Sequence, residues 1–410
     1  MPVQNLSATH SPAAWKQRRR VLYALGAGDA VAHLRQHLAG VEPPFMMSIA
    51  FSEQFFEACQ QDWPLELLTS NARRDLLLHG PHRIENLPPS PLCFRGGFRY
   101  HLGRALYGLR IVGRAVRRRV AVVIADSGTT HWCVLALLRL FRIPVVAVLH
   151  NAPWPPGHPP TRRLQRILLR LDGWFFRHIA AATVCVSPEC ERQLRQMAGR
   201  LRGPVLQCRA QYRDGFLATV SAANPAQKPF CVLFLGRLET YKGVFLLLDV
   251  AERLQRERPG GFAWKIYGEG PAAEQLAAQI AKRNLTQVVR LPGRLVGERQ
   301  ACEAMAWAHV VVVPTAASFA EGMPQCAAEG VLAGRPVVAS QVVPVAGVLG
   351  PAALLFRTGD ADDCLATLQR LASDAAAYEA ARQATQAARA QFYDHSQSLG
   401  AVLKRLLPTL

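Results

Sequence analysis

The sequence predicts an α/β protein made of two Rossmann-like domains, each built on a doubly wound parallel sheet. Short apolar runs that suit buried strands alternate with helix-length amphipathic segments along nearly the whole chain, which is typical of parallel sheets covered by helices. This periodicity is lost between about residues 203 and 228 and then restarts. The chain has 410 residues, 50% of them apolar, so it has the size of two domains and can bury a sizeable core.

The first half begins with a strand–turn–helix unit, in which glycines separate Val21–Leu25 from Ala30–Leu38. The segment Pro81–Gly97 is rich in proline and glycine and is expected to be a loop. A helix is expected to follow, with one apolar face made of Leu102, Leu106, Leu109, Val112 and Val116. The other strands expected in this half are Leu65–Leu68, Val120–Ala125, Pro144–Leu149 and Ala181–Val186.

The second half restarts with the strand Phe230–Leu235 and the helix Val244–Arg258, and a last helix is expected over His395–Leu407. Further strands are expected at Ala263–Tyr267, Val288–Leu291, His309–Val313 and Pro336–Ser340. We therefore assign residues 1–208 to an N-terminal domain and residues 209–390 to a C-terminal domain. Residues 391–410 are expected to form a C-terminal helix that packs back towards the N-terminal domain.

Positive charge is concentrated in the first half of the chain. The net charge is +19; residues 1–210 carry 28 Lys and Arg against 12 Asp and Glu, whereas residues 211–410 carry 20 against 17. Such an asymmetric field favours an anionic partner, such as lipid headgroups, a pyrophosphate-linked acceptor or nucleic acid. A general bias of the genome towards arginine is the alternative explanation.

The sequence also indicates a compartment. Its first residues lack the apolar segment of a secretory signal, and its most apolar stretch, His131–Leu149, is interrupted by arginines and a proline, so no transmembrane helix is expected. Ten cysteines occur without CxxC pairs, which predicts free thiols rather than disulfides or a zinc site. We expect a cytoplasmic protein, and the basic first half leaves open peripheral attachment to the cytoplasmic face of a membrane.

The most informative stretch, Pro314–Gly334, joins a strand to a helix. Glu321 lies in the loop, Pro324 suits the first turn of the helix, and Glu329 lies within the helix. The two carboxylates flank a helix N-terminus whose N–H groups can bind an anion, and carboxylates accept hydrogen bonds from vicinal hydroxyls. Taken alone, the pair is explained more simply by a glutamate that compensates the helix dipole and a solvated helical glutamate.

A loop between strand and helix, Gly236–Gly243, presents Arg237 and Lys242. Arginine offers a bidentate fork and lysine a point charge, and both suit phosphate. No Walker motif is present, so these two cations would have to bind the phosphates. A basic surface turn is the alternative for this loop.

Two further turns suit a nucleotide. Gly268 and Gly270 half match a dinucleotide-binding glycine pattern between a strand and a helix, a weak signal alone. Gly293 and Arg294 end another strand and could form a wall for a base.

The order and spacing of these motifs resemble the C-terminal half of retaining glycosyltransferases of the GT-B fold, family 4. The resemblance covers about residues 230–375, through GRL…YKG, YGEGP, VRLPG, EGMPQCAAEGVLAGRPVVAS and RTGDADDCLATLQRL in that order. It implies two Rossmann-like domains facing an interdomain cleft, with the acceptor on the N-terminal domain and a nucleotide-sugar donor on the C-terminal domain. The reaction would be hexosyl transfer to a lipid-linked, glycan or small-molecule acceptor, with retention of configuration, as in polysaccharide biosynthesis.

The resemblance also assigns roles to single residues. Arg237 and Lys242 contact the donor diphosphate, Glu321 meets the donor sugar, and Glu329 holds the ribose hydroxyls. The implied catalytic set is His150, Arg237, Lys242 and Glu321. The implied donor-binding set is Arg237, Lys242, Gly268, Gly270, Gly293, Arg294, Gly322, Met323 and Glu329.

The resemblance implies neither a metal nor a cofactor. The protein's cations and the helix N-terminus can stabilise the leaving diphosphate, which would accept the acceptor's proton during attack on the same face. Asp360-Ala361-Asp362 has the form of a metal-binding DxD motif, but it follows a strand and opens a helix, so we expect it to cap that helix.

The first half resembles the family less closely. His150 matches a strand-end histidine near the donor sugar, but Asn151 stands where the family often has Asp, and Gly26-Ala27-Gly28 replaces a Gly-Gly turn. These departures leave the acceptor open, and a structural role is the alternative for His150. Asp126, at the end of another strand, is expected to cap a helix rather than to serve the site.

Three other functions remain open from the sequence. A sugar-nucleotide epimerase would convert a nucleotide-sugar without any acceptor. A basic membrane- or nucleic-acid-binding module would lack catalysis, and nucleic acid is not expected because the aromatic residues are scattered rather than interleaved with basic ones. A catalytically silent partner subunit is disfavoured by the presence of both glutamates and both cations.

Overall fold

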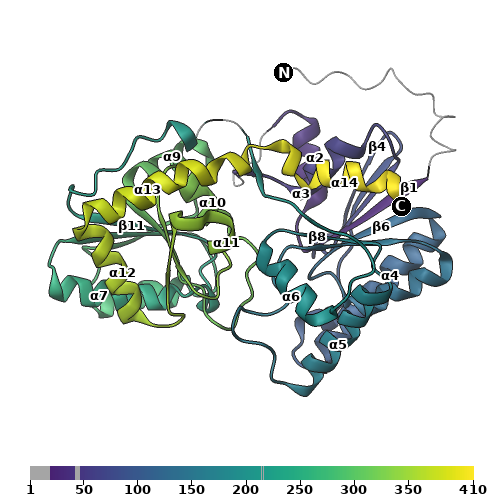
Figure 1. Cartoon of the computed structure of the whole chain (residues 1–410), viewed down its shortest axis with the longest axis horizontal. Coiled ribbons are helices and arrows are strands. Elements are labelled where there is room, and N and C mark those ends of the chain that lie inside the picture. The colour runs from purple at the N-terminus through teal and green to yellow at the C-terminus, as the bar shows by residue number, and fades with distance from the viewer. Residues whose placement is uncertain (1–18, 42–46, 214, 216) are drawn as a thin grey trace.

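The computed structural model describes residues 19–41, 47–213, 215 and 217–410. They form two lobes side by side, each with a central sheet flanked by helices (Figure 1). The predicted α/β architecture with two Rossmann-like domains is therefore confirmed. Most of the N-terminal segment in which no secretory signal is expected lies outside the described residues.

The N-terminal lobe contains an eight-stranded sheet in the order β4-β5-β3-β1-β6-β7-β8-β9. All neighbouring pairs are parallel except β4 and β5. The strands are β1 (Arg20–Leu25), β3 (Leu65–Thr69), β4 (Asp75–His79), β5 (His82–Asn86), β6 (Val120–Asp126), β7 (Val145–Leu149), β8 (Ala182–Cys185) and β9 (Val205–Gln207). The flanking helices are α2 (Ala30–Leu38), α3 (Phe51–Cys59), α4 (Phe98–Arg117), the 3-10 helix η3 (Trp132–Phe141), α5 (Arg163–His178) and α6 (Pro188–Ala198).

The C-terminal lobe contains a six-stranded parallel sheet in the order β13-β12-β11-β14-β15-β16. Its central strands are continuous apolar runs because both faces of a parallel sheet are covered by helices. The strands are β11 (Phe230–Leu235), β12 (Phe262–Tyr267), β13 (Val289–Gly293), β14 (Val310–Val313), β15 (Val337–Ser340) and β16 (Ala353–Phe356). The helices are α7 (Val244–Glu257), α8 (Ala273–Lys282), α9 (Gly297–Trp307), α10 (Gln325–Leu332), α11 (Ala346–Leu349), α12 (Ala361–Ser373) and α13 (Ala375–Arg389). The last helix of the chain, α14 (Leu399–Leu406), belongs to the core of the N-terminal lobe.

The chain crosses between the lobes twice. The first crossing follows β9 and includes β10 (Gln211–Tyr212), which pairs antiparallel with β2 (Ser48–Ile49). The second lies between α13 and α14, which extends over the N-terminal lobe (Figure 1). There α14 packs on α3, and the Leu399 N–H donates to Gln54 Oε1 at 3.0 Å. The two crossings are in contact, because Arg209 of the first donates from Nε to Gln391 Oε1 of the second at 2.8 Å.

Two expectations for the N-terminal lobe were wrong. The segment expected to be a loop over residues 81–97 contains β5, which pairs with β4 and β3, and a short 3-10 helix, Pro91–Phe94. The strand is hard to recognise because its residues are mostly polar. The buried Glu85 forms ion pairs with Arg83 of the same strand, 2.9 Å away, and with Arg114 of α4, 2.8 Å away.

The expected apolar face of α4 was also misplaced. Leu102, Leu106 and Leu109 are exposed, whereas the buried positions of α4 are Gly103, Tyr107, Gly108, Ile111, Val112 and Ala115. The helix packs through its small residues: a Cβ on Gly108 would lie 2.3 Å from Thr130 Oγ1. Leucines that the pattern predicts to be buried therefore project from the lobe. Among the described residues, no helix is both long and apolar enough to cross a membrane.

Candidate functional site

Backbone contacts between loops shape the edge of the C-terminal sheet. A Cβ on Gly243, where φ is +77°, would lie 1.9 Å from the carbonyl oxygen of Pro314. A Cβ on Gly268 would lie 1.8 Å from the carbonyl oxygen of Gly236. Similarly, a Cβ on Gly270 would lie 2.4 Å from the carbonyl oxygen of Leu238. These glycines bring the loops after β11, β12 and β14 into direct contact, which fixes the side chains between them.

Lys242 and Glu321 form the central ion pair of this edge. Lys242 Nζ lies 2.5 Å from Glu321 Oε1, and Thr315 Oγ1 donates to the same oxygen at 2.9 Å. The ammonium group also lies 4.6 Å from the centre of the Phe319 ring, a cation–π distance. Glu321 is buried, so these contacts hold its carboxylate in one orientation.

Arg237 lies at the open side of the same edge. Its side chain is 65% exposed, and Nη2 donates to the hydroxyl of Tyr241 at 2.5 Å. The Tyr241 ring stacks on Phe319 with centroids 4.5 Å apart. Nη1 lies 3.7 Å from Glu239 Oε1. The guanidinium group is nevertheless largely exposed and can bind an anion.

Glu329 is a buried carboxylate on α10. It is 5% exposed, and it makes no ion pair or side-chain hydrogen bond with any residue that the structure describes. Burial raises the pKa of its carboxyl from 4.5 to about 8. A buried polar group without a partner is costly, so this carboxyl is suited to receive hydroxyl donors from a ligand.

These side chains surround one cavity of about 600 Å³. Seven of the residues implied by the sequence line it: Arg237, Lys242, Gly268, Arg294, Glu321, Met323 and Glu329. Gly270, Gly293 and Gly322 are not among the residues that line it. Gly293 instead accepts a hydrogen bond from the Gly268 N–H at 2.8 Å. The C-terminal lobe supplies nearly the whole lining, and Met47 comes from the other lobe.

Gly322 joins the two lobes through its backbone. A Cβ on Gly322 would lie 1.6 Å from the carbonyl oxygen of His150. Beside it, the Ala152 N–H donates to the carbonyl oxygen of Glu321 at 3.1 Å. Met323 packs against the apolar cores of both lobes. The loop that carries Glu321 is thus held by the end of β7 in the N-terminal lobe.

The structure brings the backbone of His150 close to Glu321 but turns its imidazole into a neighbouring cavity of about 260 Å³. Nε2 lies 2.8 Å from Asp126 Oδ1, an ion-pair contact without the alignment of a hydrogen bond. The ring also lies against Phe51, with centroids 4.5 Å apart. This second cavity shares Gln325 with the larger one.

Asp126 was expected to cap a helix, and that was wrong: no helix begins directly after β6. Its Oδ1 accepts a hydrogen bond from the Tyr23 hydroxyl at 2.7 Å. Burial, together with the charge of Asp126, raises the pKa of Tyr23 well above its ordinary value. Tyr23, Asp126 and His150 lie together because they belong to or follow β1, β6 and β7, which are adjacent parallel strands whose carboxyl ends meet at one edge of the sheet.

The Asp360 motif caps a helix as expected. Asp360 Oδ1 accepts a hydrogen bond from the Asp363 N–H at 3.0 Å at the start of α12. Asp362, the second acid of the DxD pattern, pairs with Arg253. Both acids therefore have structural roles, one as a helix cap and the other in an ion pair with Arg253.

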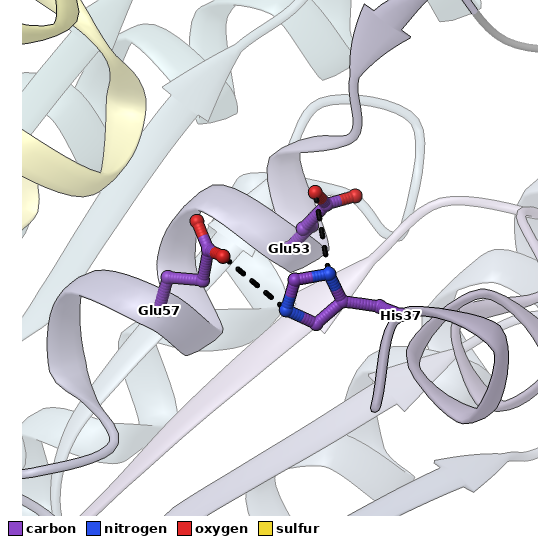
Figure 2. A group of neighbouring side chains, drawn as sticks. All are labelled: His37, Glu53 and Glu57. Carbon is purple, nitrogen blue, oxygen red and sulfur yellow. Dashed lines mark ion pairs between the residues drawn. The ribbon is translucent and has the colours of Figure 1, made fainter. Parts of the chain in front are cut away.

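Another acidic group, beside the second cavity, lies between α2 and α3 (Figure 2). His37 places Nδ1 3.4 Å from Glu53 Oε1 and Nε2 3.3 Å from Glu57 Oε1. The hydrogen bond to Glu57 raises the pKa of His37, and Arg213 donates to Glu53 at 2.6 Å. Because both imidazole nitrogens face carboxylates and an arginine already pairs with Glu53, the cluster is an ion-pair network that joins two helices.

The sequence of the chain matches two families. The family described as Glycosyltransferase Family 4 matches residues 57–205, and the one described as Glycosyl transferases group 1 matches residues 229–374. A glycogen synthase of Mycobacterium tuberculosis is 27% identical over 265 residues, which make up 62% of this chain and 59% of that protein. The match thus spans less than two thirds of that relative's length.

Solved structures share the fold at low identity. Sucrose-phosphate synthase from Thermosynechococcus elongatus gives a TM-score of 0.69 at 19% identity, covering 96% of this chain and 100% of that one. HepE of Anabaena, in complex with UDP, gives 0.65 at 15% identity, with coverage of 96% and 100%. Trehalose 6-phosphate synthase from Burkholderia multivorans gives 0.70 at 14% identity, with coverage of 96% and 99%.

Proposed function

Because the chain belongs to the group 1 glycosyltransferases of family 4, which have the GT-B fold, we propose that it transfers a sugar from a nucleotide-sugar to an acceptor. The observation that carries the proposal is the larger cavity. Its lining combines Arg237 and Lys242, which suit a diphosphate, with Glu329, a buried carboxyl that has no ion pair or side-chain hydrogen bond with any described residue.

We propose that the donor lies across this cavity with its diphosphate at Arg237 and Lys242. Glu329 then accepts hydrogen bonds from ribose hydroxyls, and Glu321 accepts them from the donor sugar. Gly268, Gly270, Gly293 and Arg294 shape the nucleotide end, while Gly322 and Met323 shape the sugar end. In support, Anabaena HepE is described in complex with UDP.

The proposed chemistry retains the configuration at the anomeric carbon. The bond from that carbon to the diphosphate oxygen breaks, and a bond to the acceptor hydroxyl forms on the same face. The proton of the hydroxyl passes to the departing diphosphate, whose negative charge Arg237 and Lys242 stabilise. The proposal includes no metal and no cofactor.

The acceptor is proposed to bind the N-terminal domain, residues 1–208, opposite the donor domain, residues 209–390. Support comes from the cavity around His150 and Asp126, which shares Gln325 with the donor cavity. A third cavity, of about 340 Å³, shares Ala27 with the cavity around His150 and Asp126 and leads towards α4. We propose a lipid-linked, glycan or small-molecule acceptor, as in polysaccharide biosynthesis. We also propose that the protein is cytoplasmic and attaches peripherally to a membrane.

A panel of UDP-, GDP- and ADP-sugars tests the function. A bound donor raises the midpoint of thermal unfolding by mass action, and the same mixtures are then analysed for products with and without candidate acceptors. We expect stabilisation by one nucleotide class and release of free nucleotide that depends on the acceptor. An epimerised nucleotide-sugar formed without acceptor would assign the site to epimerisation instead, and no stabilisation by any nucleotide would contradict the donor site.

A further inference from the structure

The outer helices of the N-terminal lobe expose a large apolar area. On α4, Phe98 is 70% exposed, and Leu102, Leu106 and Leu109 follow it along the same helix. Four apolar side chains spaced at intervals of three or four residues lie on one face of a helix. Within the described part of the chain, this face packs on none of the apolar cores, since those side chains are exposed.

The same area continues onto η3 and α5, and η3 contacts both α4 and α5. On η3, Leu140 is 78% exposed and Phe141 is also exposed. On α5, Ile167 is 52% exposed and Trp174 is exposed as well. In Figure 1, α4 and α5 lie close together on the lower side of the N-terminal lobe. We call the exposed apolar residues of these three elements the outer face: Phe98, Leu102, Leu106, Leu109, Leu137, Leu140, Phe141, Leu164, Ile167, Leu171 and Trp174.

The segment that carries the outer face is strongly basic. Residues 87–188 contain 15 arginines and two acidic residues, Asp126 and Asp172. Of these arginines, Arg114 and Arg118 pair with glutamates of the sheet. Asp126 is buried in the site, and Asp172 accepts a hydrogen bond from the Cys133 N–H at 3.1 Å beneath the helices. On α5, three exposed arginines form no ion pair with any described residue, and they alternate with the exposed apolar residues: Arg163, Arg166 and Arg170.

We propose that the outer face binds the surface of an anionic lipid bilayer, with the projecting apolar side chains in the interface and the arginines at the lipid headgroups. Basic amphipathic helices with exposed Leu, Ile, Phe and Trp bind anionic membranes in this way. A second copy of the chain is a poor partner, because it would bring two arginine-rich faces together without acidic residues to pair with them. A bilayer needs no matching pockets, so it accommodates side chains that project from three separate elements.

Flotation of the full chain with lipid vesicles tests this inference. The inference names the surface behind the membrane attachment included in the proposed function, and because flotation needs no sugar donor, its outcome is independent of the proposed transfer reaction. Vesicles of mixed phosphatidylglycerol and phosphatidylcholine are compared with vesicles of phosphatidylcholine alone, at low salt and at roughly 0.5 M salt. We expect binding to the anionic vesicles at low salt, weaker binding at high salt, and little binding to neutral vesicles.

Two sets of variants separate the apolar and the charged contributions. Leu140→Ser with Ile167→Ser should weaken partitioning by about tenfold or more, since two apolar side chains no longer leave water. Arg163→Gln with Arg166→Gln and Arg170→Gln should abolish the preference for anionic vesicles. The control replaces exposed apolar residues of the other lobe, Val296→Ser with Leu355→Ser, and should bind like the parent.

Three outcomes would overturn the inference. The first is an absence of flotation with anionic vesicles at low salt. The second is equal partitioning of the parent and the Leu140–Ile167 variant, with both melting at the same temperature. The third is failure to float together with retention on an acidic polypeptide such as polyglutamate, which would assign the outer face to an acidic protein.

Discussion

Lys242 Nζ lies 2.5 Å from Glu321 Oε1, in a contact that joins the loop after β11 to the loop after β14. Glu321 is buried, the Lys242 side chain is 19% exposed, and the ammonium group lies 4.6 Å from the centre of the Phe319 ring. In the proposed site, a donor diphosphate would meet a cation that already has a carboxylate partner. The two side chains hold one another in position at the wall of the cavity proposed for the donor.

Lys242→Ala should reduce turnover by on the order of 10²–10³, because one preorganised cation at the leaving diphosphate is lost. It should also lower stability by about 1–3 kcal/mol, because Glu321 stays buried without its partner. Turnover and chemical unfolding of the single variant are compared with those of Lys242→Ala combined with Glu321→Gln. The stability losses should not add; strictly additive losses would contradict the coupling.

Arg237→Ala should reduce turnover by on the order of 10²–10³ while leaving the thermal midpoint unchanged. The difference from Lys242 follows from exposure: the Arg237 side chain is 65% exposed, so its removal leaves no buried charge behind. Arg299→Ala, at an exposed position on α9, is the matched control and should behave like the parent. Normal turnover in Arg237→Ala would remove this residue from the mechanism.

Glu329→Gln should bind nucleotide more weakly than the parent but should be more stable at high pH. The folded-state pKa of Glu329 is about 8 and its ordinary value is 4.5. The folded protein therefore holds a proton that the unfolded chain releases between these values, so stability is lost as the pH rises from 4.5 to 8. The variant should melt at a higher temperature than the parent at pH 8.5, and the two should converge near pH 4.5.

Nucleotide binding gives the second readout for the same variant. Ribose hydroxyls donate to the ionised carboxylate, so the affinity of the parent should rise with pH through about 8, whereas Glu329→Gln should bind about tenfold or more weakly at all pH values. Calorimetry at several pH values measures both. Equal affinity in parent and variant would contradict the ribose-binding role.

Transfer should continue in EDTA. The proposed site assigns the leaving diphosphate to Arg237 and Lys242, and the acids of the DxD pattern are used to cap α12 and to pair with Arg253. Initial rates are measured after extensive chelation and again after addition of Mg²⁺ or Mn²⁺. Loss of activity that either ion restores would refute the proposal that no metal takes part.

Gly322→Ala should disrupt the contact between the lobes. Its Cβ would lie 1.6 Å from the His150 carbonyl oxygen, a backbone atom that has little room to move. We expect an open arrangement with a transfer rate at least about tenfold lower, because small displacements of reacting groups are costly. Gly113→Ala on α4 is the control, since a Cβ there meets nothing within 4 Å. Small-angle scattering and initial rates compare the two variants.

Local patterns predict much of this fold because the strands of a parallel sheet are buried on both faces. Phe230–Leu235 and Val310–Val313 are continuous apolar runs, and both are fully buried strands. β5 was missed because it carries Glu85, which is buried with ion pairs to Arg83 and to Arg114, and Arg114 lies on a helix further along the chain. The buried face of α4 was predicted wrongly because the helix packs closely through Gly103 and Gly108, which leaves its larger leucines exposed.

Four of the residues singled out in the sequence lie together in the structure, although their roles stay predictions. Arg237, Lys242, Glu321 and Glu329 were all found in the sequence and all line one cavity. Thr315 was missed because its role is a single hydrogen bond to Glu321, which a residue type common in loops does not reveal. Asp126 was misread because its partners, Tyr23 and His150, are brought to it by strands that are distant in the sequence.

The two crossings between the lobes also restrict how the protein can move. Arg209 of the first crossing bonds to Gln391 at the second, so the connections lie side by side rather than at opposite ends of the interface. Two adjacent connections define an axis, and rotation about it deforms few residues, whereas sliding or twisting the lobes would strain both segments. Motion should therefore be a single swing about this axis. Its widest opening would lie on the side away from Arg209, and substrates would enter there.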